Sequence, residues 1–184
     1  YMLEDMLFTE AVKLGVVFML KCKATNSVYN ESEAHYTISA GSVTVHASLV
    51  CNATGRKSNF ETRQRKTKLT GPHYVGIKYH VRVQRDPRYV EIHNFPGGYC
   101  GVSAIEDNQT CLCYIVNAKK LNSVHNSIPE LEKVYLYQNS HLKKLFNEAT
   151  FLFKEPLTIS GINFQIKKPA TDHSLYLGDA AGSI

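Results

Sequence analysis

The sequence contains no tryptophan, no long hydrophobic run and no regularly spaced set of metal ligands. Its most apolar stretch, LGVVFMLKC at residues 14–22, is much shorter than the roughly 20 residues of a membrane-spanning helix. None of the histidines forms an H-E-x-x-H motif and no G-x-S-x-G elbow is present, so nothing supports a zinc peptidase or a hydrolase. Eleven tyrosines and eight phenylalanines favour a strand-rich fold.

Cysteine provides no disulfide framework. Five cysteines are an odd number, and a chain of 184 residues can bury a core without covalent cross-links. No signal peptide is recognisable, so we expect reduced thiols and a cytoplasmic location. Cys111 and Cys113 share one face of a predicted strand, where we expect small buried side chains and no metal site.

Charge is modestly positive, +5 in total, and much of it lies in GRKSNFETRQRKTK at residues 55–68. Such a run can bind phosphate or nucleic acid, or it can be a solvated helix or loop. Phe60 is its only aromatic residue, whereas RNA-binding modules stack bases on aromatic side chains. A phosphate- or nucleic-acid-binding module through residues 56–68 therefore stays an alternative function, and no nucleic-acid partner is expected.

The first sixty residues indicate a helix followed by strands. Apolar residues of LEDMLFTEAVKLG recur at helical spacing up to a stop at Gly15, and VVFMLKCKAT at residues 16–25 is typical of a buried strand. The SAGS segment, between residues 38 and 43, predicts a hairpin turn. SLVCNATG is then apolar and turns at Gly55.

From about residue 70 the pattern becomes that of an antiparallel meander. YVGIKYHVRVQ, YVEIHNF, YCGVSAIED and TCLCYIVNA have the character of strands with one exposed face. IPELEKVYLYQ and SHLKKLFNEATFLF predict helices, with Pro129 in a first turn. Two further strands, LTISGINFQIKK and HSLYLGD, are predicted after these helices. The predicted fold class is α+β: an incomplete α/β layer and an antiparallel β-sheet subdomain that carries helices.

The last apolar strand ends in a glycine turn that can approach a ligand closely. It reads LYLGDAAG, so that Gly178 follows the strand and Ala180, Ala181 and Gly182 are small. The Asp179 carboxylate can accept hydrogen bonds from sugar hydroxyls, and the small residues can begin a helix that faces phosphate. The alternative is an ordinary strand-to-helix turn in which Asp179 caps the helix.

An earlier strand, in VCNATGRKSN, ends in the same way. Gly55 makes the turn, and Arg56 and Ser58 follow it. These two side chains could hold a pyrophosphate, or they could cap a helix.

Together, the two motifs and the antiparallel segment between them resemble the flavoprotein family of aromatic hydroxylases, flavin-dependent halogenases and geranylgeranyl reductases. That family has a Gly-Asp motif at the ribityl and pyrophosphate region of FAD, matched here by GDAAG at 178–182. Its A-D-G-R-x-S turn is matched by NATGRKS at 52–58, with Thr54 in place of Asp and Asn52 in place of the leading Gly. HNFPGGYCGVSAIEDNQTCLCYIV is most similar to the reductase and halogenase branch.

The resemblance implies that the complete protein is an FAD-dependent oxidoreductase of reductase or monooxygenase type, with NAD(P)H as the candidate electron donor. Residues 1–60 and 170–184 would belong to the FAD-binding domain, and residues 61–169 would form the substrate-binding subdomain, whose sheet would roof the flavin ring. The residues implied to contact FAD are Gly178, Asp179, Ala180, Ala181, Gly182, Gly55, Arg56 and Ser58.

The family's G-x-G-x-x-G fingerprint is absent from these 184 residues. We expect it upstream of residue 1, and a further helix after GDAAG, so that the chain is expected to be an internal part of a longer flavoprotein. The alternative is a truncated, cofactor-free remnant without activity.

The expected substrate is a small apolar or aromatic molecule beneath the antiparallel sheet, with peripheral membrane association if it is a lipid. The glycine turn in HNFPGGYCG lets the backbone approach a planar ring. An ordinary hairpin with packed aromatic side chains is the alternative, and no catalytic residue is assigned. The candidate pocket residues are His93, Phe95, Gly97, Gly98, Tyr99 and Cys100.

Overall fold

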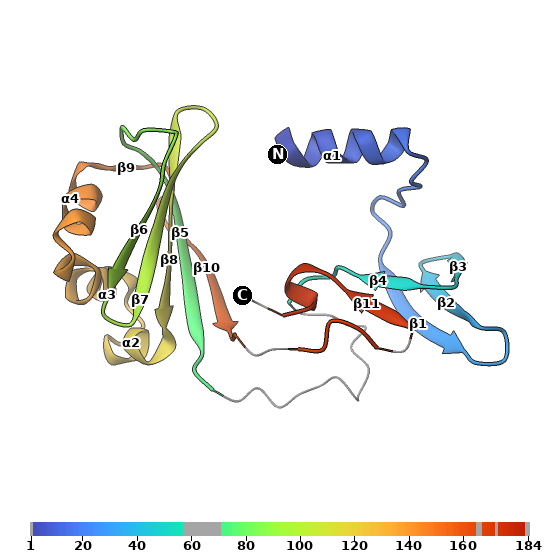
Figure 1. Ribbon diagram of the computed structural model, residues 1–184. Helices are drawn as coiled ribbons and strands as arrows, with labels where there is room; N and C mark the ends of the chain where they lie inside the picture. Colours follow the sequence, from blue (N-terminus) through green and yellow to red (C-terminus); the bar gives the residue numbers. More distant parts are fainter. Residues whose placement is uncertain (1, 57–70, 165–166, 172, 183–184) are drawn as a thin grey trace. The chain divides into compact units, whose positions relative to one another are not determined.

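The computed structural model describes residues 2–56, 71–164, 167–171 and 173–182. The chain divides into two compact units. The first unit comprises residues 1–67 and 166–182, and the second comprises residues 68–165 and 183–184. In Figure 1 the first unit runs from blue to cyan and returns in red, while the second contains the large green-to-orange sheet with its helices.

The first unit begins with helix α1, Met2–Lys13, which ends near Gly15 as predicted. Gly15 has a φ of +85°, a conformation that favours glycine after a helix. The buried strand predicted over residues 16–25 is wrong, because the first strand begins only at Ala24. Apolar residues from Val16 to Leu20 are exposed, Val17 by 87%, and Phe18 packs against Phe8 of α1 with the ring centroids 4.3 Å apart.

Three antiparallel strands follow, β1 (Ala24–Asn30), β2 (His35–Ala40) and β3 (Val43–Ala47), paired in that order. The β2–β3 turn lies in the SAGS segment, as predicted, and its Gly41 has a φ of +64°. Tyr36 of β2 is buried with its ring 5.0 Å from that of Tyr29.

The first unit also contains a parallel pair of short strands, β4 (Val50–Asn52) and β11 (Ser174–Tyr176). The 3-10 turn η3, Gly178–Ala180, follows β11. The hydroxyls of Tyr36 and Ser174 are hydrogen-bonded at 2.6 Å, which connects this pair to the β1–β3 sheet.

A larger antiparallel sheet forms the second unit, with the order β10-β5-β8-β7-β6, and the two-residue strand β9 pairs with the end of β5. The predicted meander is therefore confirmed. The strands are β5 (Tyr74–Arg82), β6 (Val90–Phe95), β7 (Gly98–Ile105), β8 (Gln109–Asn117), β9 (Thr150–Phe151) and β10 (Leu157–Ile162).

Helices cover one face of this sheet, on the side where Figure 1 shows α2 to α4. Asn117, Ser127 and Asn139 cap them by accepting hydrogen bonds from main-chain N–H groups of the first turns. Pro129 lies in the first turn of α3, as predicted. The bounds are α2 (Ala118–Ser123), α3 (Ile128–Val134), η2 (Leu136–Gln138) and α4 (Ser140–Glu148).

The main hydrophobic core lies between these helices and what we call the covered face of the sheet. Because side chains alternate along a strand, the even-numbered residues of β7 and β8 and the odd-numbered residues of β5 share this face. Fully buried core residues include Ile77, Val81, Cys100, Leu112, Tyr114, Val116, Leu131, Leu136 and Leu142.

The opposite face of the sheet, called the open face below, leaves apolar side chains accessible. Ile92 is 67% exposed, Ile159 49% and Tyr99 42%. Register places Tyr99, Ile115 and Gly76 in one row, and Gly101, Cys113 and Lys78 in the next.

These elements confirm the predicted α+β class, with an antiparallel sheet that carries helices. The buried environment predicted for Cys113 is wrong, because its side chain lies on the open face and is exposed. Within the described ranges, no helix has the length and apolar character needed to cross a bilayer.

Candidate functional site

The parallel pair β4–β11 brings the two glycine motifs together. Strand residues Val50 and Ser174 are opposite each other, as are Asn52 and Tyr176, although more than 120 residues separate them in the sequence. The main-chain N–H of Leu177 donates to the carbonyl oxygen of Asn52 at 2.9 Å. The turns at Gly55 and Gly178 therefore leave the same edge of the pair, where ligands of parallel sheets usually bind.

The turn after β4 is held by Asn52, which is 7% exposed. Its Oδ1 accepts hydrogen bonds from the Thr54 N–H at 3.1 Å and the Thr54 hydroxyl at 2.7 Å. This Asx turn directs the chain into Gly55, whose φ is +76°. Sequence analysis noted Asn52 only as a departure from the family pattern, and its place between an apolar strand and Thr-Gly is the signal for such a turn.

Arg56 follows the turn and is half-buried. Its Nη1 is buried and has no hydrogen-bond partner among the described residues. A buried guanidinium nitrogen without a partner is costly, so the site favours an anionic group there. Ser58, the other polar residue predicted here, lies outside the described residues, as does the rest of the basic run.

The turn after β11 exposes an acid. Gly178 has a φ of +57°, and the Ala181 N–H closes the turn on the Gly178 carbonyl oxygen at 2.8 Å. Asp179 is exposed, whereas Ala180 is 1% exposed and anchors the turn. Gly182 has a φ of +141°. The structure thus places an exposed carboxylate and a small-residue turn after β11, beside the turn that follows β4 and leads to Arg56.

A hollow of about 200 Å³ lies in the first unit between the β1–β2 strands and the β4–β11 pair. Tyr36, Asn52 and Ser174 line it with polar groups, and Ile38 and Tyr176 with apolar ones. The hollow therefore adjoins the strands β4 and β11 that precede the two glycine motifs.

Strand alternation separates the six predicted pocket residues of the second unit. Gly97, Gly98 and Tyr99 border a hollow of about 310 Å³ on the open face, together with Ile115 and Phe164. Gly97 has a φ of +94° in the β6–β7 turn, which explains the glycine there.

The other three predicted pocket residues lie on the covered face. Phe95 is 7% exposed and Cys100 is fully buried. Burial raises the pKa of the Cys100 thiol to about 12, so this thiol stays protonated and is not a nucleophile at neutral pH. The structure therefore does not bring Phe95 and Cys100 together with Tyr99.

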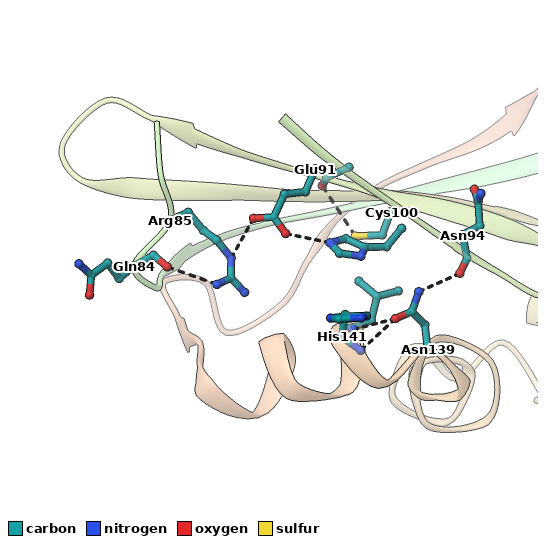
Figure 2. A network of polar contacts seen from close by, with 10 residues as sticks. Gln84, Arg85, Glu91, Asn94, Cys100, Asn139 and His141 are labelled. Atoms are coloured by element: carbon teal, nitrogen blue, oxygen red, sulfur yellow. Dashed lines mark hydrogen bonds and ion pairs between the residues drawn. The ribbon is translucent and has the colours of Figure 1, made fainter. Parts of the chain in front are cut away.

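His93 belongs to a polar cluster between β6 and α4. Its Nε2 lies 3.0 Å from Glu91 Oε2, and Glu91 Oε1 lies 3.3 Å from the Arg85 guanidinium. The His93 and His141 rings are 6.1 Å apart. Figure 2 shows Arg85 and Glu91 pointing toward each other, and Asn139, the N-cap of α4, donating to the Asn94 carbonyl oxygen. The hydrogen bond between Asn139 and Asn94 joins the start of α4 to the edge strand β6.

Sequence analysis missed a buried acid, Glu132 of α3, which is 8% exposed. Its Oε1 accepts hydrogen bonds from the hydroxyls of Tyr79 at 2.8 Å and Tyr114 at 2.7 Å. Burial raises the pKa of Glu132, and the two hydroxyls oppose that shift. The described residues contain no cluster of His, Cys, Asp and Glu that could hold a metal ion.

No protein-family model and no curated protein matches the sequence. Solved structures do match. A flavoprotein/dehydrogenase from Cytophaga hutchinsonii has a TM-score of 0.72 at 18% identity, over 97% of this chain and 46% of its own. The flavin-dependent halogenase CmlS has a TM-score of 0.72 at 16% identity, over 98% and 34%.

A geranylgeranyl bacteriochlorophyll reductase-like protein from Thermoplasma acidophilum has a TM-score of 0.68 at 18% identity, over 97% of this chain and 46% of its own. The chain thus spans less than half the length of these structures. Fold similarity over nearly all its residues confirms the resemblance that the glycine motifs indicated. This chain has the fold of part of an FAD-dependent oxidoreductase of the halogenase and geranylgeranyl reductase type.

Proposed function

We propose that this chain is part of an FAD-dependent oxidoreductase, of reductase or monooxygenase type, that acts on a small apolar or aromatic substrate. The observation that carries the proposal is the parallel β4–β11 register, which places the Asn52–Gly55 and Gly178–Gly182 turns at one edge. The flavin would supply the redox chemistry, with NAD(P)H as electron donor, and the protein would supply position and charge.

The residues at this edge fit the polar part of FAD. Arg56 has a buried Nη1 without a partner among the described residues, which suits a pyrophosphate oxygen. Asp179 is exposed and can accept hydrogen bonds from ribityl hydroxyls. Gly55 and Gly178, both at positive φ, let the backbone approach the cofactor. The first unit is thus proposed as cofactor-binding and the second as substrate-binding.

The substrate side of the proposal rests on the open face of the second unit. Tyr99, Ile115 and Phe164 border a hollow there, and Ile92 and Ile159 extend the apolar surface. An accessible apolar hollow with few polar groups suits an apolar or aromatic molecule. The free cysteines described in the chain fit a reducing, cytoplasmic location.

Titration of the purified protein with FAD, followed by flavin fluorescence, tests the cofactor site. Asp179→Ala and Arg56→Met should each weaken FAD binding about tenfold or more, because each removes a charged hydrogen-bonding group. Lys133→Met, an exposed change on α3, is the control and should leave the affinity unchanged. Equal affinity for all four proteins would overturn the assignment of this edge.

A further inference from the structure

Lys78 is a cation on the open face. It lies on β5 in register with Cys113 of β8 and Leu157 of β10, and it is half-buried. Partial desolvation on the sheet surface raises the pKa of the Cys111 and Cys113 thiols, although the Cys113 side chain is exposed, and the Lys78 charge opposes that rise. Burial and Lys78 together lower the pKa of His80. Register thus places Lys78 on the open face, between Leu157 of β10 and Cys113 of β8.

Nothing in the described part of this face neutralises Lys78. Register assigns to the open face the even-numbered residues of β5 and β6, the odd-numbered residues of β7 and β8, and Leu157 and Ile159, and none of these is Asp or Glu. Among the described residues, Lys78 has no ion pair. Glu106 raises the pKa of His80, which lies in the neighbouring row of the open face. A half-buried cation without a carboxylate favours an anion.

Gly101 adds an independent sign that a ligand approaches the same row. It lies in the middle of β7, opposite Cys113, where a glycine weakens a strand. A side chain there would meet only the Cys113 carbonyl oxygen, at 3.7 Å, so packing within the unit does not require glycine. Without a side chain at Gly101, the backbone of β7 can be approached from the open face, two strand spacings or about 10 Å from Lys78.

Apolar side chains surround Gly101 on the open face. Tyr99 and Ile115, in the adjacent row, line the 310 Å³ hollow, and Ile92 lies beside Gly101 on β6. A flat apolar molecule on Gly101 would therefore contact Ile115 and Ile92 along its edges and extend toward Lys78. The positive charge of Lys78 and the flat apolar surface around Gly101 together indicate which kind of molecule would bind here.

We propose that the open face binds a small molecule with a flat apolar body and a single anionic group, a carboxylate or sulfonate. The body lies on Gly101 between Ile92 and Ile115, and the anion pairs with the Lys78 ammonium. This inference rests on the proposed function and names the substrate class of the same site. A neutral apolar molecule and a protein partner are the competing occupants.

Two fluorescent probes of similar size test the contribution of the anionic group separately from that of the apolar body. 8-Anilinonaphthalene-1-sulfonate is anionic, and N-phenyl-1-naphthylamine is neutral; both are titrated into the 184-residue chain without flavin. We expect the anionic probe to bind more tightly. Lys78→Met should weaken the anionic probe about tenfold and leave the neutral probe unchanged, while Lys78→Arg should keep most of the affinity. Gly101→Val should weaken both probes, and the exposed Lys133→Met should weaken neither.

Equal affinity of the two probes, or a Lys78→Met protein that binds the anionic probe as the wild type does, would overturn the proposal in favour of a neutral occupant. Unchanged binding of both probes by Gly101→Val would remove the open face as their site and favour a macromolecular partner. Circular dichroism of each variant shows that it is folded. Because no flavin is present, failure here is distinct from failure of FAD to bind at Asp179 and Arg56.

Discussion

At the scale of single residues, Glu132 is the most consequential side chain of the core. Its carboxyl group is buried between α3 and the sheet, where it accepts hydrogen bonds from the hydroxyls of Tyr79 and Tyr114. The pKa of both tyrosines is raised, first by burial and then by the neighbouring carboxylate. Burial also raises the pKa of Glu132 itself, against the opposing effect of the two tyrosine hydroxyls, and this favours the neutral carboxyl group in the folded protein.

This predicts a pH-dependent stability. Because the folded-state pKa of Glu132 lies above its ordinary value of 4.5, the folded protein holds a proton that the unfolded chain releases. The stabilisation is complete below pH 4.5 and is lost as pH rises through the folded-state pKa. Urea unfolding across this window should show a falling free energy of unfolding for the wild type and a flatter profile for Glu132→Gln.

Glu130→Gln is the matched control, since Glu130 is exposed on the same helix. It should retain the wild-type pH profile. Glu132→Ala should be the most destabilised of the three, by about 1–3 kcal/mol for each tyrosine hydroxyl left without a partner. If Glu132→Gln follows the same pH profile as the wild type, the buried carboxyl group does not control this stability.

At the scale of elements, strand β7 carries two glycines with different roles. An added Cβ at Gly98 would collide with the Ile115 carbonyl oxygen and lie 2.8 Å from Phe95 Cζ, so the close approach requires glycine. Gly101 has no such neighbour. The first glycine therefore serves packing, and the second is free to serve a ligand.

Substitution by alanine should distinguish them. Gly98→Ala should destabilise the protein by about 1–3 kcal/mol, because a backbone contact cannot yield as a flexible side chain can. Gly101→Ala should change stability by less than about 1 kcal/mol. Urea denaturation of both variants measures the difference, and equal losses of stability would contradict the distinction.

Local patterns predicted most elements but not their surroundings. Alternation identified the meander, and SAGS located a hairpin turn. The buried strand predicted for residues 16–25 was wrong because a run of apolar residues does not reveal whether other residues cover it, and here Val17 is exposed. The pocket residues were chosen by nearness to a glycine turn, yet strand alternation turns Phe95 and Cys100 away from Tyr99.

At the scale of the whole molecule, the fold was predictable because two short motifs far apart in sequence carried it. GDAAG and NATGRKS gave the resemblance, and the β4–β11 register shows their strands side by side. Lys78 and Gly101 could not be found in this way, because their significance depends on which residues share the open face. That relation appears only when strand register is known.

The measurement that tests the account most directly is the flavin content of the protein purified from its own source. The denatured material is examined by absorbance and mass spectrometry for released FAD. The account predicts about one FAD per chain, or uptake of FAD to that level when it is added. Protein that carries no flavin and takes up none would contradict the assignment of the β4–β11 edge as a flavin site.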